Sequence, residues 1–255
     1  MGKYIKFLII FLSLFLSAAF FPEPAFAKED LYIPEWTVHA SLKENGDLEI
    51  SEDITFEFSE KFNGVYRDIT LDLAYSLSDI SVKEARGDSF VSYERAEKAK
   101  KGDYGVYTIE KKKDRTTIRI YSPSKDEIKI FKINYVVNSA ATKYNDTGEL
   151  YYKFLGKENK TSIGNFTVFI DLPYNDDSDR VKVFTHGPSN GRIDKIVNNQ
   201  YPMLYRLQAA NVKPGSFIEA RLLFPPEYIA QSERVIDIDR YQEIINEEMT
   251  LQIKK

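Results

Sequence analysis

Beyond residue 30, apolar and polar residues alternate along most of the chain, which is the pattern of half-buried β-strands. From residue 48 to residue 58 the even positions read Leu, Ile, Glu, Ile, Phe and Phe, whereas the odd positions are all polar. Residues 36–42 alternate in the same way. Between the two segments, Asn45-Gly46 supplies the positive φ angles of a tight turn. The pattern predicts an antiparallel hairpin.

Five further alternating segments predict strands up to residue 138, at residues 65–71, 80–84, 104–110, 115–121 and 127–137. In the last of these the apolar phase slips between Ile130 and Phe131. Because one extra residue would restore the alternation, we expect a β-bulge there. Seven short strands at this spacing predict a β-sandwich domain over residues 28–138.

A second series of strands follows a loop-like stretch at residues 138–148, which is the expected domain boundary. The predicted strands cover residues 150–155, 165–172, 181–184, 193–197, 204–208 and 216–224. They predict a second β domain over residues 139–226. The predicted fold class is therefore all-β, with two β-sandwich-like domains.

Residues 227–255 contain neither Gly nor Pro and predict a helical tail. An apolar stripe recurs at helical spacing along this segment, consisting of Ile238, Tyr241, Ile245, Met249 and Ile253. Ile244 and Leu251 lie off the stripe. Two interpretations stay open for this segment: a frayed or disordered surface tail, and a stalk or docking helix.

The first 27 residues have the organisation of a secretory signal peptide. Lys3 and Lys6 precede an apolar run of fifteen residues from Phe7 to Phe21, and Ala25-Phe26-Ala27 offers small residues for cleavage. The run is short of the roughly 20 residues that a bilayer-spanning helix needs. We therefore expect an extracytoplasmic protein, either secreted or tethered to the membrane by an uncleaved segment.

The amino-acid composition excludes several kinds of site and partner. The chain has no cysteine, which excludes disulfides, thiolate metal sites and cysteine nucleophiles. Bacterial export fits such a chain, because many bacterial exported proteins dispense with disulfides. Its net charge of −4 argues against a nucleic-acid partner, which requires a clustered basic surface.

No catalytic, metal or cofactor signature stands out. Residues 187–191 spell the G-x-S-x-G of a hydrolase nucleophile elbow, but a strand and not a helix is predicted after them. The two histidines, His39 and His186, both precede the motif and lie far apart, so they give neither a catalytic triad nor a metal-binding pattern. We expect this motif to be a turn.

The most unusual segment is residues 62–69, with the sequence FNGVYRDI. Arg67 and Asp68 are adjacent on a predicted strand, so they point to opposite faces and each needs its own partner. One interpretation is a structural cross-strand ion pair. The other is an arginine that faces a ligand, for which Tyr66, Arg67 and Asp68 are the candidate binding residues.

Four motifs in order carry a family resemblance, namely NGDL at residues 45–48, NGVYRDI at 63–69, GELYY at 148–152, and DLP at 171–173 followed by HGP at 186–188. With them, residues 33–226 resemble the extracytoplasmic part of the bacterial family called domain of unknown function 2207, a group of predicted membrane proteins. The resemblance implies architecture and location but no chemistry. Members usually continue into transmembrane helices, whereas no further apolar run precedes Lys254-Lys255.

The predicted function is that of an exported, non-enzymatic module of the cell envelope that binds or scaffolds an envelope protein or polymer, with membrane association and without a cofactor. Two alternatives come from other classes. One is a cell-wall glycan hydrolase that uses two carboxylates about 5–10 Å apart in a cleft. The other is the sensory ectodomain of a membrane assembly, with the helical tail as its signalling stalk.

Overall fold

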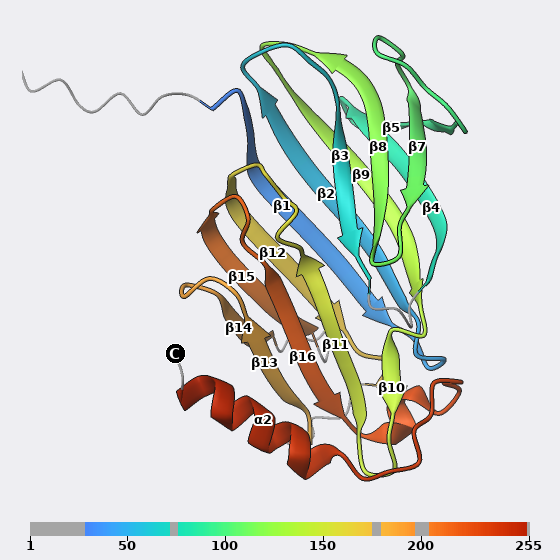
Figure 1. Ribbon diagram of the computed structural model, residues 1–255, viewed down its shortest axis with the longest axis vertical. Helices are drawn as coiled ribbons and strands as arrows, with labels where there is room; N and C mark the ends of the chain where they lie inside the picture. The colour runs from blue at the N-terminus through green and yellow to red at the C-terminus, as the bar shows by residue number, and fades with distance from the viewer. Residues whose placement is uncertain (1–28, 72–75, 175–179, 197–203, 254–255) are drawn as a thin grey trace, which may run out of the picture.

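The computed structural model describes residues 29–71, 76–174, 180–196 and 204–253, and the described chain is almost entirely β-structure (Figure 1). The strands are β1 (Leu31–Leu42), β2 (Leu48–Phe58), β3 (Phe62–Thr70), β4 (Ser76–Arg86), β5 (Ser89–Ser92), β6 (Glu94–Arg95), β7 (Val106–Lys111), β8 (Arg115–Ser124), β9 (Glu127–Asn138), β10 (Ala141–Lys143), β11 (Gly148–Leu155), β12 (Ile163–Asp171), β13 (Lys182–His186), β14 (Arg192–Ile196), β15 (Leu204–Val212) and β16 (Ile218–Phe224). A 3₁₀ turn, η2 (Pro226–Ile229), and a helix, α2 (Tyr241–Ile253), follow. The all-β prediction with a C-terminal helix is confirmed. The predicted signal peptide lies outside the described residues.

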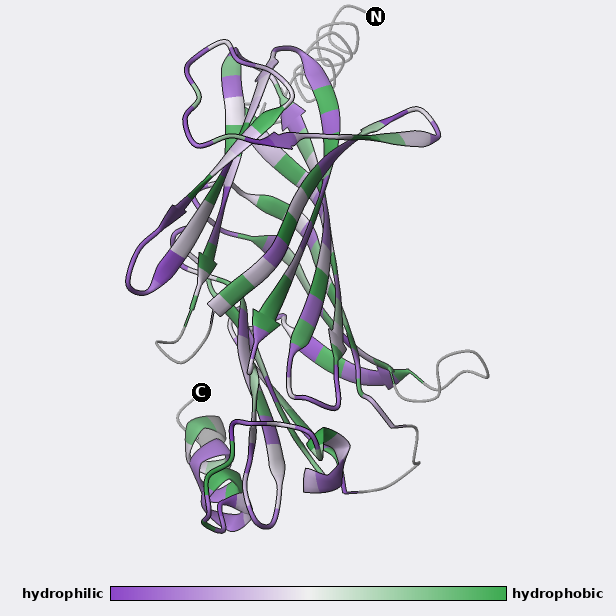
Figure 2. Ribbon diagram, turned by 90° about the vertical axis from the view of Figure 1, so that its right-hand side faces the viewer, coloured by the Kyte–Doolittle hydropathy of each residue, from purple (hydrophilic) through white to green (hydrophobic). Residues whose placement is uncertain are grey.

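Three sheets build the fold. One has eight strands in the order β14-β15-β12-β1-β2-β9-β4-β5, and two have four, β3-β8-β7-β6 and β10-β11-β16-β13. In Figure 1 both small sheets lie in front of the large one. Green and purple alternate along the strands in Figure 2, as a buried and a wet face require. The buried apolar residues of all three sheets form one continuous core.

The large sheet crosses the boundary predicted between residues 28–138 and 139–226. β1 pairs antiparallel with β2, as the hairpin at Gly46 predicts, and its other edge pairs in parallel with β12. Parallel neighbours need no local turn and leave no local sequence signal. The two halves therefore share one sheet, and their independence as folding units stays a prediction.

The predicted bulge near Ile130-Phe131 is wrong. β9 pairs with β2 from Glu127 to Val137 without a shift in register. Ile128 and Ile130 simply lie on the outer face of the large sheet, where they are 62% and 37% exposed. The apolar pattern of the sequence shifts because these two apolar side chains are exposed to solvent, whereas the backbone pairing is regular.

The tail is less helical than predicted. Residues between η2 and α2 run along the edge of β10, where Val235 forms an isolated parallel bridge with Lys143. The predicted apolar stripe does not face the protein, because Met249 is 58% exposed and Ile244, which lies off the stripe, is fully buried. Of the helices in the described ranges, none combines the length and apolarity needed to span a bilayer.

A substitution at Gly64 tests how closely β3 packs against β8. Its φ of +147° is a conformation for glycine, and a Cβ atom there would lie 1.9 Å from the carbonyl oxygen of Ile120. We expect Gly64→Ala to lower the free energy of unfolding by at least about 1–3 kcal/mol. Gly87→Ala is the control, because Gly87 also has a positive φ but nothing lies within 4 Å of its added Cβ. Equal losses in thermal melting would contradict this account.

Candidate functional site

Arg67, one of the three candidate binding residues, points into the core from β3 and is 4% exposed. Its Nε and Nη2 atoms donate to the two carboxylate oxygens of Glu52 on β2 at 2.8 and 2.9 Å. Nη2 also donates to the carbonyl oxygen of Phe154 on β11 at 2.8 Å. The guanidinium lies over the ring of Trp36 on β1, 4.9 Å from its centroid. One side chain thus connects all three sheets.

Charge and burial oppose each other in this cluster. Burial alone would lower the pKa of Arg67, but the charge and hydrogen bonds of Glu52, together with Tyr135 and Tyr152, outweigh it and raise the pKa above its ordinary value. The hydroxyl of Tyr135 donates to Glu52 at 2.5 Å, and burial, followed by the charge of Glu52, raises its pKa well above the usual range. The geometry is that of the predicted cross-strand ion pair.

The other two candidate residues flank Arg67 on the opposite face of β3. Tyr66 is exposed, and Asp68 accepts a hydrogen bond from Thr117 on β8. All three line a cavity of about 100 Å³ beside Trp36. Such a volume holds about three waters and is too small for a polymer. Ligand binding by Tyr66, Arg67 and Asp68 stays a prediction.

A larger recess lies on the outer face of the eight-stranded sheet, away from both small sheets. This outer groove, about 720 Å³ in volume, is lined by His39, Glu49, Ser51, Asn134, Phe169 and Asp171. These residues occupy the polar phase of the same alternation that builds the core. The sequence does not distinguish these positions, because a polar position on a strand has the pattern of ordinary solvated surface.

The parallel pairing of β1 with β12 gives the outer groove an aromatic floor. His39 and Phe169 are register partners, and their rings stack with centroids 5.1 Å apart and planes inclined by 17°. His39 is exposed and Phe169 is half-buried, so the pair offers a flat surface to solvent. Flat aromatic faces pack against apolar faces of sugars or peptide side chains.

Carboxylates flank this floor. Burial raises the pKa of Asp171 above its usual value, although Lys43 and a hydrogen bond from Ser41 partly offset the effect. Glu49 pairs with Lys43 at 2.9 Å, and Asp79 also lines the groove. The groove therefore combines aromatic, amide, hydroxyl and carboxylate groups. Among the described residues, no group of three or more potential side-chain ligands could hold a metal ion.

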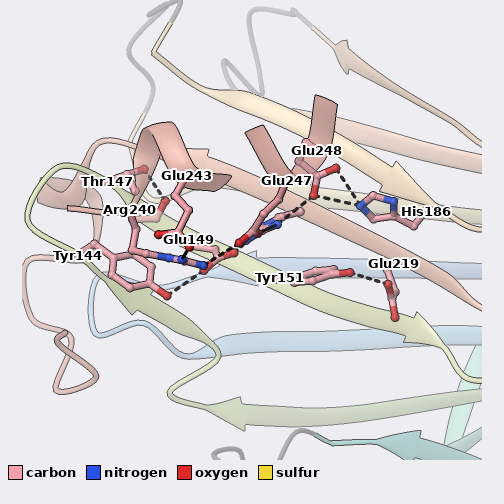
Figure 3. A network of polar contacts seen from close by, with 12 residues as sticks. Tyr144, Thr147, Glu149, Tyr151, His186, Glu219, Arg240, Glu243, Glu247 and Glu248 are labelled. Atoms are coloured by element: carbon pink, nitrogen blue, oxygen red, sulfur yellow. Dashed lines mark hydrogen bonds and ion pairs between the residues drawn. The ribbon is translucent and has the colours of Figure 1, made fainter. Parts of the chain in front are cut away.

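A second polar cluster holds α2 against the outer face of the sheet that contains β16 (Figure 3). Arg221 on β16 is buried and binds Glu149 of β11 through Nε at 2.6 Å. Its Nη1 atom binds two residues of the helix, Glu247 at 2.9 Å and Glu248 at 3.1 Å. His186 of β13 contacts the far side of Glu248 at 3.1 Å.

The first turn of α2 is fixed separately. The carboxylate of Asp146 accepts hydrogen bonds from the backbone N–H groups of Arg240 and Tyr241 at 2.9 and 3.2 Å, which caps the helix. His186 is followed by residues 187–191, where the N–H of Gly191 bonds the carbonyl oxygen of Pro188 before β14 begins. That motif is the predicted turn, and a strand follows it as expected.

The family described as "Predicted membrane protein (DUF2207) N-terminal domain" matches residues 32–224. The chain belongs to the DUF2207 family. The match covers the three sheets, whereas η2 and α2 follow it. No curated protein matches the sequence.

The DUF2207 chain matches solved structures only weakly. A candidate protease from Parabacteroides distasonis has 8% identity and a TM-score of 0.45, with 76% of this chain and 41% of that chain covered. A variant of the M1 zinc metallopeptidase from Deinococcus radiodurans has 12% identity and a TM-score of 0.38, with 78% and 44% covered. This chain therefore spans less than half the length of either structure, and likenesses this weak carry no functional argument.

Replacing Arg67 in the DUF2207 domain tests the ion pair. Arg67→Ala leaves Glu52 buried without its cation, which typically costs about 3–5 kcal/mol. We expect a matching loss in the free energy of unfolding by denaturant titration. The control is Arg119→Ala, because Arg119 pairs with Glu110 on the exposed surface, where ion pairs contribute about 0–1 kcal/mol. A variant that melts like wild type but loses ligand binding would support the ligand-facing interpretation.

The helix contacts of the DUF2207 chain predict a pH dependence. Burial alone would raise the pKa of Glu247, but Arg221 and Arg240 outweigh it and lower the pKa below the ordinary 4.5. A carboxyl with a lowered pKa contributes stability above its unfolded pKa and loses that contribution as pH falls through the folded pKa. We expect the difference in melting temperature between wild type and Glu247→Gln to shrink below pH 4.5.

The control for this pH series is Glu94→Gln, because the Glu94 side chain is exposed on β6. Its difference from wild type should stay flat over the same range. A difference for Glu247→Gln that grows as the pH falls would contradict the assigned role of Arg221.

Proposed function

We propose that this protein is an extracytoplasmic, non-enzymatic binding domain of a membrane-protein family, and that the outer groove binds a glycan polymer of the cell envelope. The family match supports the membrane context, and the N-terminal signal pattern supports the extracytoplasmic side. The observation that carries the proposal is the stacked pair of His39 and Phe169 on the floor of an open groove.

Polysaccharides fit the chemistry of this groove. The apolar face of a sugar ring packs on an aromatic surface, while its hydroxyls exchange hydrogen bonds with carboxylate, amide and hydroxyl groups. Asp171, Asn134 and Ser51 supply one of each beside the rings. The groove lies on a face built from four neighbouring strands, β12, β1, β2 and β9, so an extended chain can lie across it.

The binding test uses purified bacterial cell-wall sacculi in a sedimentation assay. We expect the wild-type protein to co-sediment and Phe169→Ala to reduce its affinity at least about tenfold, the equivalent of 1.4 kcal/mol. Phe90→Ala is the matched control, because Phe90 is an exposed aromatic residue on β5 outside the groove. Equal binding by the Phe169 variant, or no binding by wild type, would contradict the proposal.

One observation favours a hydrolase as the second candidate. A general acid needs a raised pKa, and burial raises that of Asp171, which shares the outer groove with Glu49 and Asp79. The same sacculi distinguish the two functions. Release of soluble sugar by wild type and its loss in Asp171→Asn would replace the binding proposal with glycan hydrolysis.

A further inference from the structure

The sheet surface beneath α2 is organised to receive carboxylates. Glu149 and the ring of Tyr151, which lies 5.0 Å from the guanidinium carbon of Arg221, hold that cation from within the sheet. Neither contact depends on the helix. Nη1 of Arg221 is left to face the helix, where Glu247 and Glu248 occupy it (Figure 3). We call the residues Glu149, Tyr151, His186 and Arg221 the Arg221 face.

Among the helix side chains that the structure describes, the fully buried apolar one is Ile244. Tyr241 and Ile245 are half-buried, whereas Met249 and Leu251 are exposed. Glu248 is 1% exposed, so its ion pair is formed at the cost of desolvating both charges, which offsets much of the attraction. A helix of about 13 residues is marginal in water without tertiary contacts. α2 is therefore held by Ile244, by the cap at Asp146 and by a few charged contacts, and another carboxylate-bearing helix could reproduce the contacts with Arg221 and His186.

We propose that the Arg221 face is a receptor for an acidic helix, that α2 occupies it as a tethered ligand, and that an acidic helix from a partner protein replaces α2 there. The partner helix carries two adjacent carboxylates with an apolar residue one turn earlier, as in the Ile244, Glu247 and Glu248 pattern. The charge of Arg221 and a hydrogen bond with His186 favour this chemistry. The surface is separate from the outer groove, so the inference stands without the proposed function.

Tethering explains why α2 holds the site. A segment joined by a short linker acts at an effective concentration on the order of millimolar. A free helix of equal intrinsic affinity at micromolar concentration would then lose the competition by about a thousandfold. The exchange becomes measurable when the tethered helix alone is weakened.

The test titrates a fluorescent peptide of residues 237–255 into the full chain. We expect Ile244→Ser, which weakens the tethered helix, to bind the peptide at least about tenfold more tightly than wild type does. Adding Arg221→Gln to the same chain should abolish binding. A peptide with Glu247→Gln and Glu248→Gln should fail to bind. A peptide with Glu243→Gln should still bind, because Glu243 contacts Arg240 of its own helix.

Equal binding by the double-Gln peptide, or by the chain with Arg221→Gln, would overturn charge recognition. Absence of binding to a folded Ile244→Ser chain would overturn the exchange.

Discussion

The ion pair between Arg67 and Glu52 is the interaction on which the rest of the fold depends. Glu52 lies on the inner face of β2 and is 0% exposed, between apolar neighbours that pack into the core. A buried carboxylate without a partner is strongly unfavourable. Both of its oxygens accept from Arg67, and Tyr135 adds a third donor. This charge is satisfied by Tyr135 from the neighbouring strand β9 and by Arg67 from β3 in another sheet, so an arrangement that separates β3 from β2 would leave Glu52 without its cation.

Filling the inner face in this way leaves the other face of the large sheet to solvent. Because side chains alternate, the strand that directs Trp36, Val38 and Ala40 inward must direct His39 outward. The parallel junction then places Phe169 beside it. The floor of the outer groove is thus a consequence of the same alternation and pairing that build the core. No loop has to be positioned to create it.

The sequence is informative where a structural signal is local. Alternation predicts the strands, Asn45-Gly46 predicts the β1–β2 hairpin, and adjacency of Arg67 to Asp68 predicts that the arginine needs a partner on another strand. The pairing of β1 with β12 leaves no local trace, since it joins segments far apart in the chain. The outer groove was not predictable for that reason: two of its rings meet only through this pairing.

Other errors come from equating apolar with buried. Ile128 and Ile130 face solvent, so their phase suggested a bulge that β9 does not have. In α2 the reverse occurs, because a charged residue, Glu248, is buried while Met249 is exposed. A hydrophobic stripe identifies the inner face of a helix when apolar burial holds it in place. A hydrophobic stripe does not identify the inner face when ion pairs hold the helix in place.

The two buried arginines show how similar chemistry serves different ends. Arg67 has its carboxylate partner, its carbonyl acceptor and its aromatic neighbour all on strands, so breaking any contact requires separating sheets. Arg221 keeps Glu149 and Tyr151 on strands, but its other two carboxylates belong to a helix. Moving that helix breaks both of these ion pairs, the contact of His186 with Glu248 and the hydrogen bonds to Asp146, and it exposes Ile244, but none of these contacts joins one sheet to another. Whether an arginine's contacts can open without separating the sheets therefore depends on which elements carry its partners, and not on the strength of any single ion pair.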